Sequence, residues 1–217
     1  MGSFSAAIGR MLVPKPVALA PGDRDTAWWI ARSEEFAKRH LKAEVILQER
    51  FAIPAELPWG LAIPVFDPGN LTNRGMVNSI KGVGVDVHEE ADVMKYRGSE
   101  ACGAPTLHFI NGSNRPDQDT VGLSPKQLRG TGKNYLGLRG YGLASAVYFF
   151  ATREHLDPET FTWFPEISLS GGDTAYGYGD PDGWGSSNGE VDFRWYSPGP
   201  RYYGGGARMA VSVPLKS

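Results

Sequence analysis

The clearest chemistry in this chain lies between Ser170 and Val213, where Tyr and Trp alternate with Gly, Ser, Asn and Asp. Tyr and Trp side chains bury a large contact area at little cost in conformational entropy, and the small polar residues add adaptable hydrogen bonds. The stretch contains neither His nor Cys, which often serve as catalytic bases and nucleophiles. These residue types indicate a surface that binds a ligand without converting it.

Acidic residues in the same stretch leave a second chemistry open. Asp173, Asp180 and Asp182 could serve a small hydrolase. That activity requires two carboxylates that converge in a pocket, at least one of them with a raised pKa.

Other candidate motifs are incomplete. The segment His88–Asp92 lacks the second His of a His-Glu-x-x-His zinc motif and is typical of exposed acids after a strand. Cys102 and His108 could form a nucleophile and a base, but an isolated Cys is more typical of a small buried apolar residue. The run from Gly130 to Asn134 fails as a phosphate-binding loop, because Gln127 occupies the place of its first Gly. We therefore expect no catalytic residue, metal ion or cofactor.

The elements that hold the C-terminal stretch follow from capping residues and hydrophobic periodicity. Asp25, Thr72 and Ser124 are suitable N-cap residues, and alternating apolar residues mark strands. The patterns predict helices over 26–43, from 72 through 80, from 124–125 and over 140–153, and strands over 83–87, 106–110 and 204–213. Helices come first and glycine-punctuated strands last, which predicts an α+β fold in which helices brace a small twisted antiparallel sheet. We expect residues 1–24 to form a loosely held arm, and residues 25–217 a single domain with its ligand-binding region at 171–213.

The composition of the chain limits the classes of partner that we expect the protein to bind. The 217 residues include 22 basic and 24 acidic side chains, with no basic stripe that would follow a nucleic acid backbone. Apolar runs such as Leu143–Phe150 are too short to cross a bilayer. The start of the chain lacks a secretory signal pattern, so we expect a cytoplasmic protein or display by a non-standard route. Cys102 is the only cysteine, so no intramolecular disulfide can form.

Short segments of the chain carry a family resemblance. Those at 136–144, 156–163 and 206–211 resemble a group of bacterial proteins. Gly183–Asn188, Val191–Trp195 and Gly205–Arg208 follow the order of a Gly-Trp/Ser-Ser segment, an aromatic strand and a closing Gly-Gly-x-Arg strand. This order resembles the C-type-lectin-fold variable proteins of diversity-generating retroelements, in the branch similar to formylglycine-generating enzymes.

The resemblance implies a C-type-lectin-like fold and a non-enzymatic protein that binds a protein or glycan ligand. Its exposed side chains would be replaceable while the fold stands. By this resemblance the ligand-binding positions are Tyr176, Tyr178, Asp180, Asp182, Trp184, Ser186, Ser187, Asn188, Arg194, Tyr196, Ser197, Arg201, Tyr202 and Tyr203. The implied scaffold positions are Phe193, Trp195, Ala207, Met209, Val211 and Val213.

The chain departs from the wider fold family in two respects. It contains neither the Glu-Pro-Asn nor the Trp-Asn-Asp triplet of calcium-dependent lectins. Oxygen ligands for calcium remain available from Asp180, Asp182, Asn188, Glu190 and Asp192. A single cysteine excludes the oxidation chemistry of the sulfatase-activating enzymes. A structural virion or assembly subunit attached through the N-terminal arm remains a further alternative.

Overall fold

The computed structural model describes residues 24–59, 62–89, 93, 95, 103–168, 172–183, 187–196 and 205–216. The helices are α1 (Thr26–Phe36), a π-helical turn η2 (Ala37–Leu41), α2 (Leu47–Arg50), α3 (Asn73–Gly82), α5 (Pro125–Gly130) and α6 (Leu138–Thr152). The strands are β1 (Ala62–Asp67), β2 (Asp86–Glu89), β3 (Thr106–Asn111), β4 (Phe161–Ser168), β5 (Thr174–Asp180), β6 (Glu190–Tyr196), β7 (Gly205–Gly206) and β8 (Val211–Pro214). The predicted α+β class is confirmed. The N-terminal arm predicted over 1–24 lies outside the described residues, apart from Arg24.

The strands form two sheets, where the sequence predicted one. One sheet has the order β1-β3-β8 and is antiparallel, and the other has the order β2-β6-β5-β4-β7 and is mixed. In the mixed sheet β2 runs parallel to β6, and β4 runs parallel to β7. The prediction of a single antiparallel sheet is therefore wrong. The parallel pairing joins Asp86 to Glu190, which lie far apart in the sequence, and no local pattern reveals such a partner.

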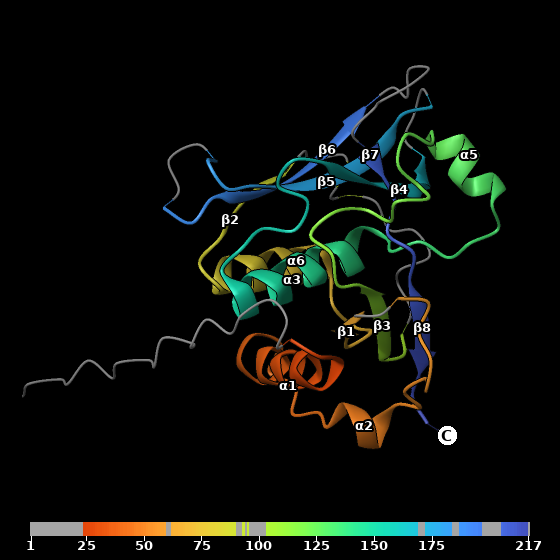
Figure 1. Ribbon diagram of the computed structural model, residues 1–217. Coiled ribbons are helices and arrows are strands. Elements are labelled where there is room, and N and C mark those ends of the chain that lie inside the picture. Colours follow the sequence, from red (N-terminus) through yellow and green to blue (C-terminus); the bar gives the residue numbers. More distant parts are fainter. Residues whose placement is uncertain are drawn as a thin grey trace, which may run out of the picture.

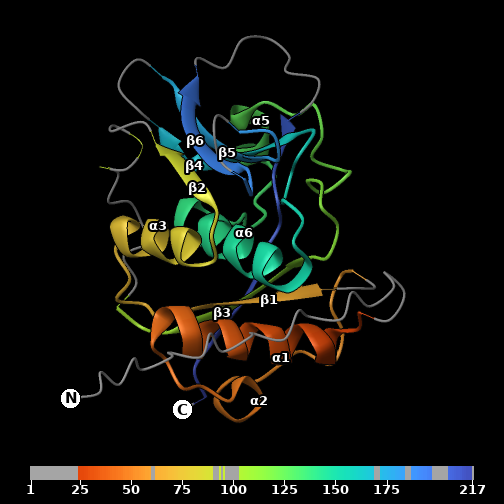
Figure 2. The same cartoon turned by 90° about the vertical axis from the view of Figure 1, so that its left-hand side faces the viewer.

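The elements stack in layers. The helices α3 and α6 lie side by side between the two sheets, and α1 covers the far side of the three-stranded sheet (Figures 1 and 2). Most side chains of α6 are buried, as its central position requires. A Cβ added at Gly142 would lie 2.1 Å from Met76 Sδ, so the glycine lets α6 approach α3 closely. The five-stranded sheet thus packs one face on α6 and turns the other face outward.

The predicted N-caps are confirmed. Asp25 Oδ1 accepts a hydrogen bond from Trp28 N at 2.7 Å, and Thr72 Oγ1 accepts one from Gly75 N at 3.1 Å. Ser124 and Gln127 form a capping box at the start of α5. The first helix ends its α-helical part at Phe36, earlier than predicted, and continues as the π-helical turn up to Lys42, which has a left-handed backbone (φ 56°).

The closing strand predicted over 204–213 is split between the sheets. Gly205–Gly206 pairs with β4, and Val211–Pro214 pairs with β3. Arg208, which is fully buried between these strands, forms an ion pair with Asp157, with 2.5 Å between Nη2 and Oδ1. The chain therefore crosses from one sheet to the other at a buried charge.

None of the described helices combines the length and the hydrophobicity needed to cross a bilayer.

Candidate functional site

Strand β5 turns different residues to its two faces. Ala175, Gly177 and Gly179 are buried on the inner face. A Cβ at Gly177 would lie 2.7 Å from a ring carbon of Tyr141, and one at Gly179 would lie 2.6 Å from Leu156 O, which shows how closely this face meets the core. The intervening Tyr176, Tyr178 and Asp180 therefore point outward and are half-buried.

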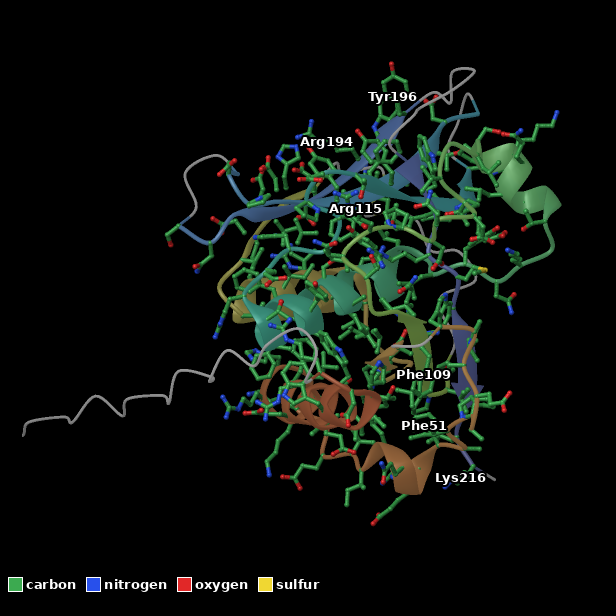
Figure 3. All side chains as sticks on the ribbon, in the orientation of Figure 1. Phe51, Phe109, Arg115, Arg194, Tyr196 and Lys216 are labelled. Atoms are coloured by element: carbon green, nitrogen blue, oxygen red, sulfur yellow. The ribbon has the colours of Figure 1, made fainter. Side chains whose placement is uncertain are left out.

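Strand β6 continues this outward surface. Tyr176 lies opposite Arg194, Tyr178 opposite Asp192, and Asp180 opposite Glu190 in the antiparallel register. Residues opposite one another in a sheet share a face. We call this surface the β5–β6 face, and it comprises Tyr176, Tyr178, Asp180, Glu190, Asp192, Arg194 and Tyr196. Arg194 and Tyr196 lie on the side of the sheet away from α6 (Figure 3).

The middle of the β5–β6 face is aromatic and positively charged. The rings of Tyr176 and Tyr178 stack with centroids 6.2 Å apart, and the guanidinium of Arg194 lies 5.7 Å from the centroid of the Tyr178 ring. The Tyr176 ring also contacts Phe161 and Trp163 of β4, at centroid distances of 5.1 and 5.5 Å. Trp163 is buried against Leu128 of α5 and Ala207, so Tyr176 packs on a hydrophobic cluster that was not predicted from the sequence. The i, i+2 spacing of Phe161 and Trp163 in a strand was the available signal.

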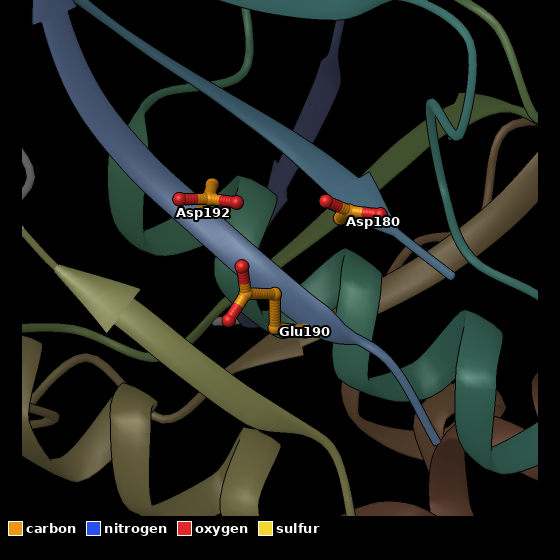
Figure 4. Close-up of side chains that lie close together, drawn as sticks. All are labelled: Asp180, Glu190 and Asp192. Carbon is orange, nitrogen blue, oxygen red and sulfur yellow. The ribbon is translucent and has the colours of Figure 1, made fainter. Parts of the chain in front are cut away.

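Three carboxylates converge where β5 ends and β6 begins. One oxygen each from Asp180, Glu190 and Asp192 lies within 4.8 Å of the other two (Figure 4). Asp192 is fully buried, and its Oδ1 accepts a hydrogen bond from Arg194 Nε at 2.9 Å. Burial raises the pKa of Glu190, and the negative charges of Asp192 and Asp180 raise it further. Burial and the charge of Asp192 also raise the pKa of Tyr178.

Three other predicted residues lie in the connection between β5 and β6, and two of them form hydrogen bonds that involve the backbone. The backbone N–H of Asp182 donates to Asp180 Oδ1 at 3.0 Å, and the Asp182 side chain is exposed outside the cluster. Asn188 Nδ2 donates to Gly84 O at 2.9 Å, which ties the connection to the turn between α3 and β2. Ser187 is exposed beside it.

The remaining predicted positions differ in outcome. Trp184, Ser186, Ser197, Arg201, Tyr202 and Tyr203 lie outside the described residues. Among the implied scaffold positions, Phe193, Ala207 and Val213 are buried, and Met209 and Val211 are half-buried. Trp195 is 42% exposed, although its strand position opposite Ala175 places it on the inner face. This exposure differs from the burial expected of a scaffold residue.

A cavity of about 220 Å³ lies apart from the β5–β6 face, near the start of α6. His108 and Ser212 line it, with His108 Nδ1 2.8 Å from Ser212 Oγ. Burial lowers the pKa of His108. The buried ion pair of Arg139 and Asp67, with 2.7 Å between Nε and Oδ2, forms another wall. Neither Asp173, Asp180 nor Asp182 lines this cavity, and Cys102 lies outside the described residues.

His155 forms a hydrogen bond with the backbone of the connection between β5 and β6. Its Nε2 lies 2.8 Å from Asn188 O, and because a carbonyl oxygen only accepts, Nε2 carries the proton. Burial lowers the pKa of His155, while Asn188 O and Asp180 oppose that shift. The neutral ring is therefore the form that the fold favours.

We expect His155 to make the protein less stable as the pH falls below about 6.5, the ordinary pKa of histidine. In that range His155 binds a proton more readily in the unfolded chain than in the folded chain. The free energy of unfolding therefore decreases as the pH decreases. His155→Gln should reduce this slope in urea unfolding measured between pH 8 and pH 5. An unchanged slope would show that His155 titrates alike in both states. His40 and His108, whose pKa values are also lowered, contribute to the slope in the same direction, and Asp117 and Glu190, whose pKa values are raised, oppose it.

Comparisons of the chain with protein-family models, curated proteins and solved structures give no match.

Proposed function

We propose that this protein is a non-enzymatic recognition protein whose β5–β6 face, with the connections that follow it, binds a protein or glycan ligand. Tyr176, Tyr178 and Tyr196 supply aromatic contact area, and Arg194 supplies a fixed positive charge among them. Aromatic residues and Arg are the side chains that most often dominate binding energy at interfaces.

The division of β5 into two faces carries the proposal. Glycines on the inner face fix the strand against Tyr141, His155 and Leu156. The outward side chains lie on the opposite face of the strand from that packing, so their replacement changes the surface there, although Tyr176 also packs against the buried Trp163 of β4. This separation is what a binding surface of adjustable specificity requires.

The division of β5 into a packed inner face and an outward face also bears on the family to which the protein belongs. We propose that the fold is C-type-lectin-like and that the protein is a variable protein of a diversity-generating retroelement. The motif order in the C-terminal part of the sequence supports this assignment, together with an outward strand face rich in Tyr, Asp and Arg. The displayed positions 184, 186, 197 and 201–203 belong to the same proposal.

Sequencing of this gene in a population of its source organism tests the family proposal. Substitutions should fall at the outward positions 176, 178, 194 and 196, and spare the inner positions 175, 177, 179 and 193. A reverse transcriptase gene and a near-copy of the variable segment should lie nearby. Equal variation on both faces, or a uniform gene without those neighbours, would remove the retroelement assignment.

Binding itself is tested with Tyr196→Ala on arrays of immobilised glycans and bacterial surface proteins. Tyr196 is 44% exposed at the end of the sheet, so its truncation should weaken binding more than about tenfold while the melting temperature changes little. Arg74→Ala, at an exposed position of α3, is the control and should bind like the unaltered protein. Equal binding by both variants, or no binding by the unaltered protein, would contradict recognition through this face.

A further inference from the structure

We propose that Asp180, Glu190 and Asp192 form a binding site for a calcium ion. The inference goes beyond ligand recognition, because all three side chains belong to one chain and calcium binding can be measured on the protein alone. Its basis is the geometry, the burial and the charge of the three side chains.

The geometry of the cluster matches the size of the ion. Calcium binds oxygen ligands at about 2.3–2.6 Å, so two oxygens on one ion lie at most about 5 Å apart. The three carboxylate oxygens all lie within 4.8 Å of one another. Asp180 and Glu190 are direct cross-strand partners, and Asp192 follows Glu190 on the same face of β6. The sheet therefore holds the three ligands in place before the ion binds.

A buried oxygen atom of Asp192 points to a ligand that the protein does not supply. The Asp192 side chain is fully buried, and Arg194 Nε donates only to its Oδ1. Within the part of the chain that the structure describes, Oδ2 is buried and has no hydrogen bond of normal geometry, while the Tyr178 hydroxyl and the Glu190 carboxyl group interact with the same carboxylate. Figure 4 shows one carboxylate oxygen of each of the three residues directed toward the middle of the cluster. Along β6, Asp192 lies between Glu190 and Arg194. Since Arg194 binds Oδ1 from one direction along the strand, Oδ2 is left to face Glu190 and the cluster.

A buried carboxylate oxygen without a donor or a cation is costly, and a metal ion removes that cost. Three ionised carboxylates carry three negative charges, and Arg194 balances one of them. A divalent cation balances the other two. The groups that face the cluster from β2 are Asp86, opposite Glu190, and His88, opposite Asp192, and both are exposed.

The ligand type favours calcium among divalent cations. All three side chains offer hard oxygen atoms, and calcium accepts carboxylate and water ligands in flexible geometry, whereas magnesium demands a near-ideal octahedron. One oxygen of Asp180 is already held by Asp182 N at 3.0 Å, which orients the other oxygen. Binding would join the ends of β5 and β6 and so stabilise the β5–β6 face.

The test is calorimetric titration of the full chain with calcium chloride after treatment with a chelator, combined with thermal unfolding. We expect one site per chain. The melting temperature should rise by about 5–10 °C at a calcium concentration about 100 times Kd. Glu190→Gln and Asp192→Asn should each weaken calcium binding more than about tenfold. Asp119→Asn, which removes an exposed carboxylate paired with Lys133, is the matched control and should keep the full response.

No heat of binding together with no thermal shift in the unaltered protein would overturn the site, as would equal calcium affinity in Glu190→Gln and Asp119→Asn. If Asp192→Asn does not fold, Glu190→Gln decides alone, because Glu190 is only half-buried. A response to magnesium equal to that to calcium would overturn the choice of ion. Calcium binding without any binding of glycans or proteins would leave the cation site established and the proposed function contradicted.

Discussion

Arg208→Ala should lower the free energy of unfolding by about 3–5 kcal/mol, the largest loss that we expect from any single substitution described for this protein. Both Arg208 and Asp157 are fully buried, and they form two contacts, from Nη2 to Oδ1 at 2.5 Å and from Nε to Oδ2 at 3.3 Å. Removal of the guanidinium leaves the Asp157 carboxylate buried without its cation. Urea unfolding at pH 7 measures the loss.

The environment of the pair explains why the loss is large. Arg208 Nη1 also donates to Ser113 O at 3.0 Å, and Thr162 Oγ1 donates to Asp157 Oδ2 at 2.6 Å. Asp157 itself has a left-handed backbone, with φ 56°. The single arginine therefore connects three segments: the loop after β3, the connection before β4, and the crossing between β7 and β8.

An exposed ion pair provides the control for Arg208. Arg115 Nη2 lies 2.5 Å from Glu159 Oε2, and the two side chains are 62% and 71% exposed. Because solvent screens such a pair, Arg115→Ala should cost less than about 1 kcal/mol. Equal losses from Arg208→Ala and Arg115→Ala would show that the buried pair does not stabilise the fold in the way described.

Gly179→Ala should lower the free energy of unfolding by about 2–3 kcal/mol, although it adds one methyl group. The new Cβ would lie 2.6 Å from Leu156 O and 2.6 Å from His155 Cβ. Leu156 O already accepts a hydrogen bond from Gly179 N at 3.0 Å, so the strand cannot shift away without losing that bond. Chemical unfolding of the two proteins gives the difference.

Gly130→Ala is the matched control for Gly179. Apart from its own helix and its neighbours in the chain, no atom of the described residues lies within 4 Å of a Cβ at Gly130, which ends α5. The free energy of unfolding should change by no more than about 0.5 kcal/mol, since Ala favours a helix over Gly. A loss at Gly130 as large as that at Gly179 would mean that close packing is not the cause.

Local signals in the sequence were sufficient for the helix starts and the fold class. Asp25, Thr72 and Ser124 act as N-caps as predicted, because a cap depends on residues only two or three positions away. The alternation of Tyr176, Tyr178 and Asp180 with Ala175 and the two glycines is likewise visible in the sequence. In an extended strand, residues at this spacing lie on one face.

Contacts between distant segments were decided by the tertiary structure alone. The sequence drew attention to the acidic residues of the C-terminal part. Only the register of β5 with β6 brought Asp180, Glu190 and Asp192 together and left Asp182 outside. The same holds for Arg208. Its sequence context indicates a closing strand, whereas its burial beside Asp157 depends on a partner 51 positions away.

The composition and periodicity of this sequence thus determined which residues cap helices, which side chains lie on alternate faces of a strand, and which segment is rich in Tyr, Trp and small polar residues. Each of these depends on the backbone geometry of neighbouring residues. The tertiary structure decided the split of the last strand between two sheets, the parallel pairing of β2 with β6, and the burial of individual charges. These depend on the free energy of packing whole elements together, to which no short stretch of sequence contributes a separable signal.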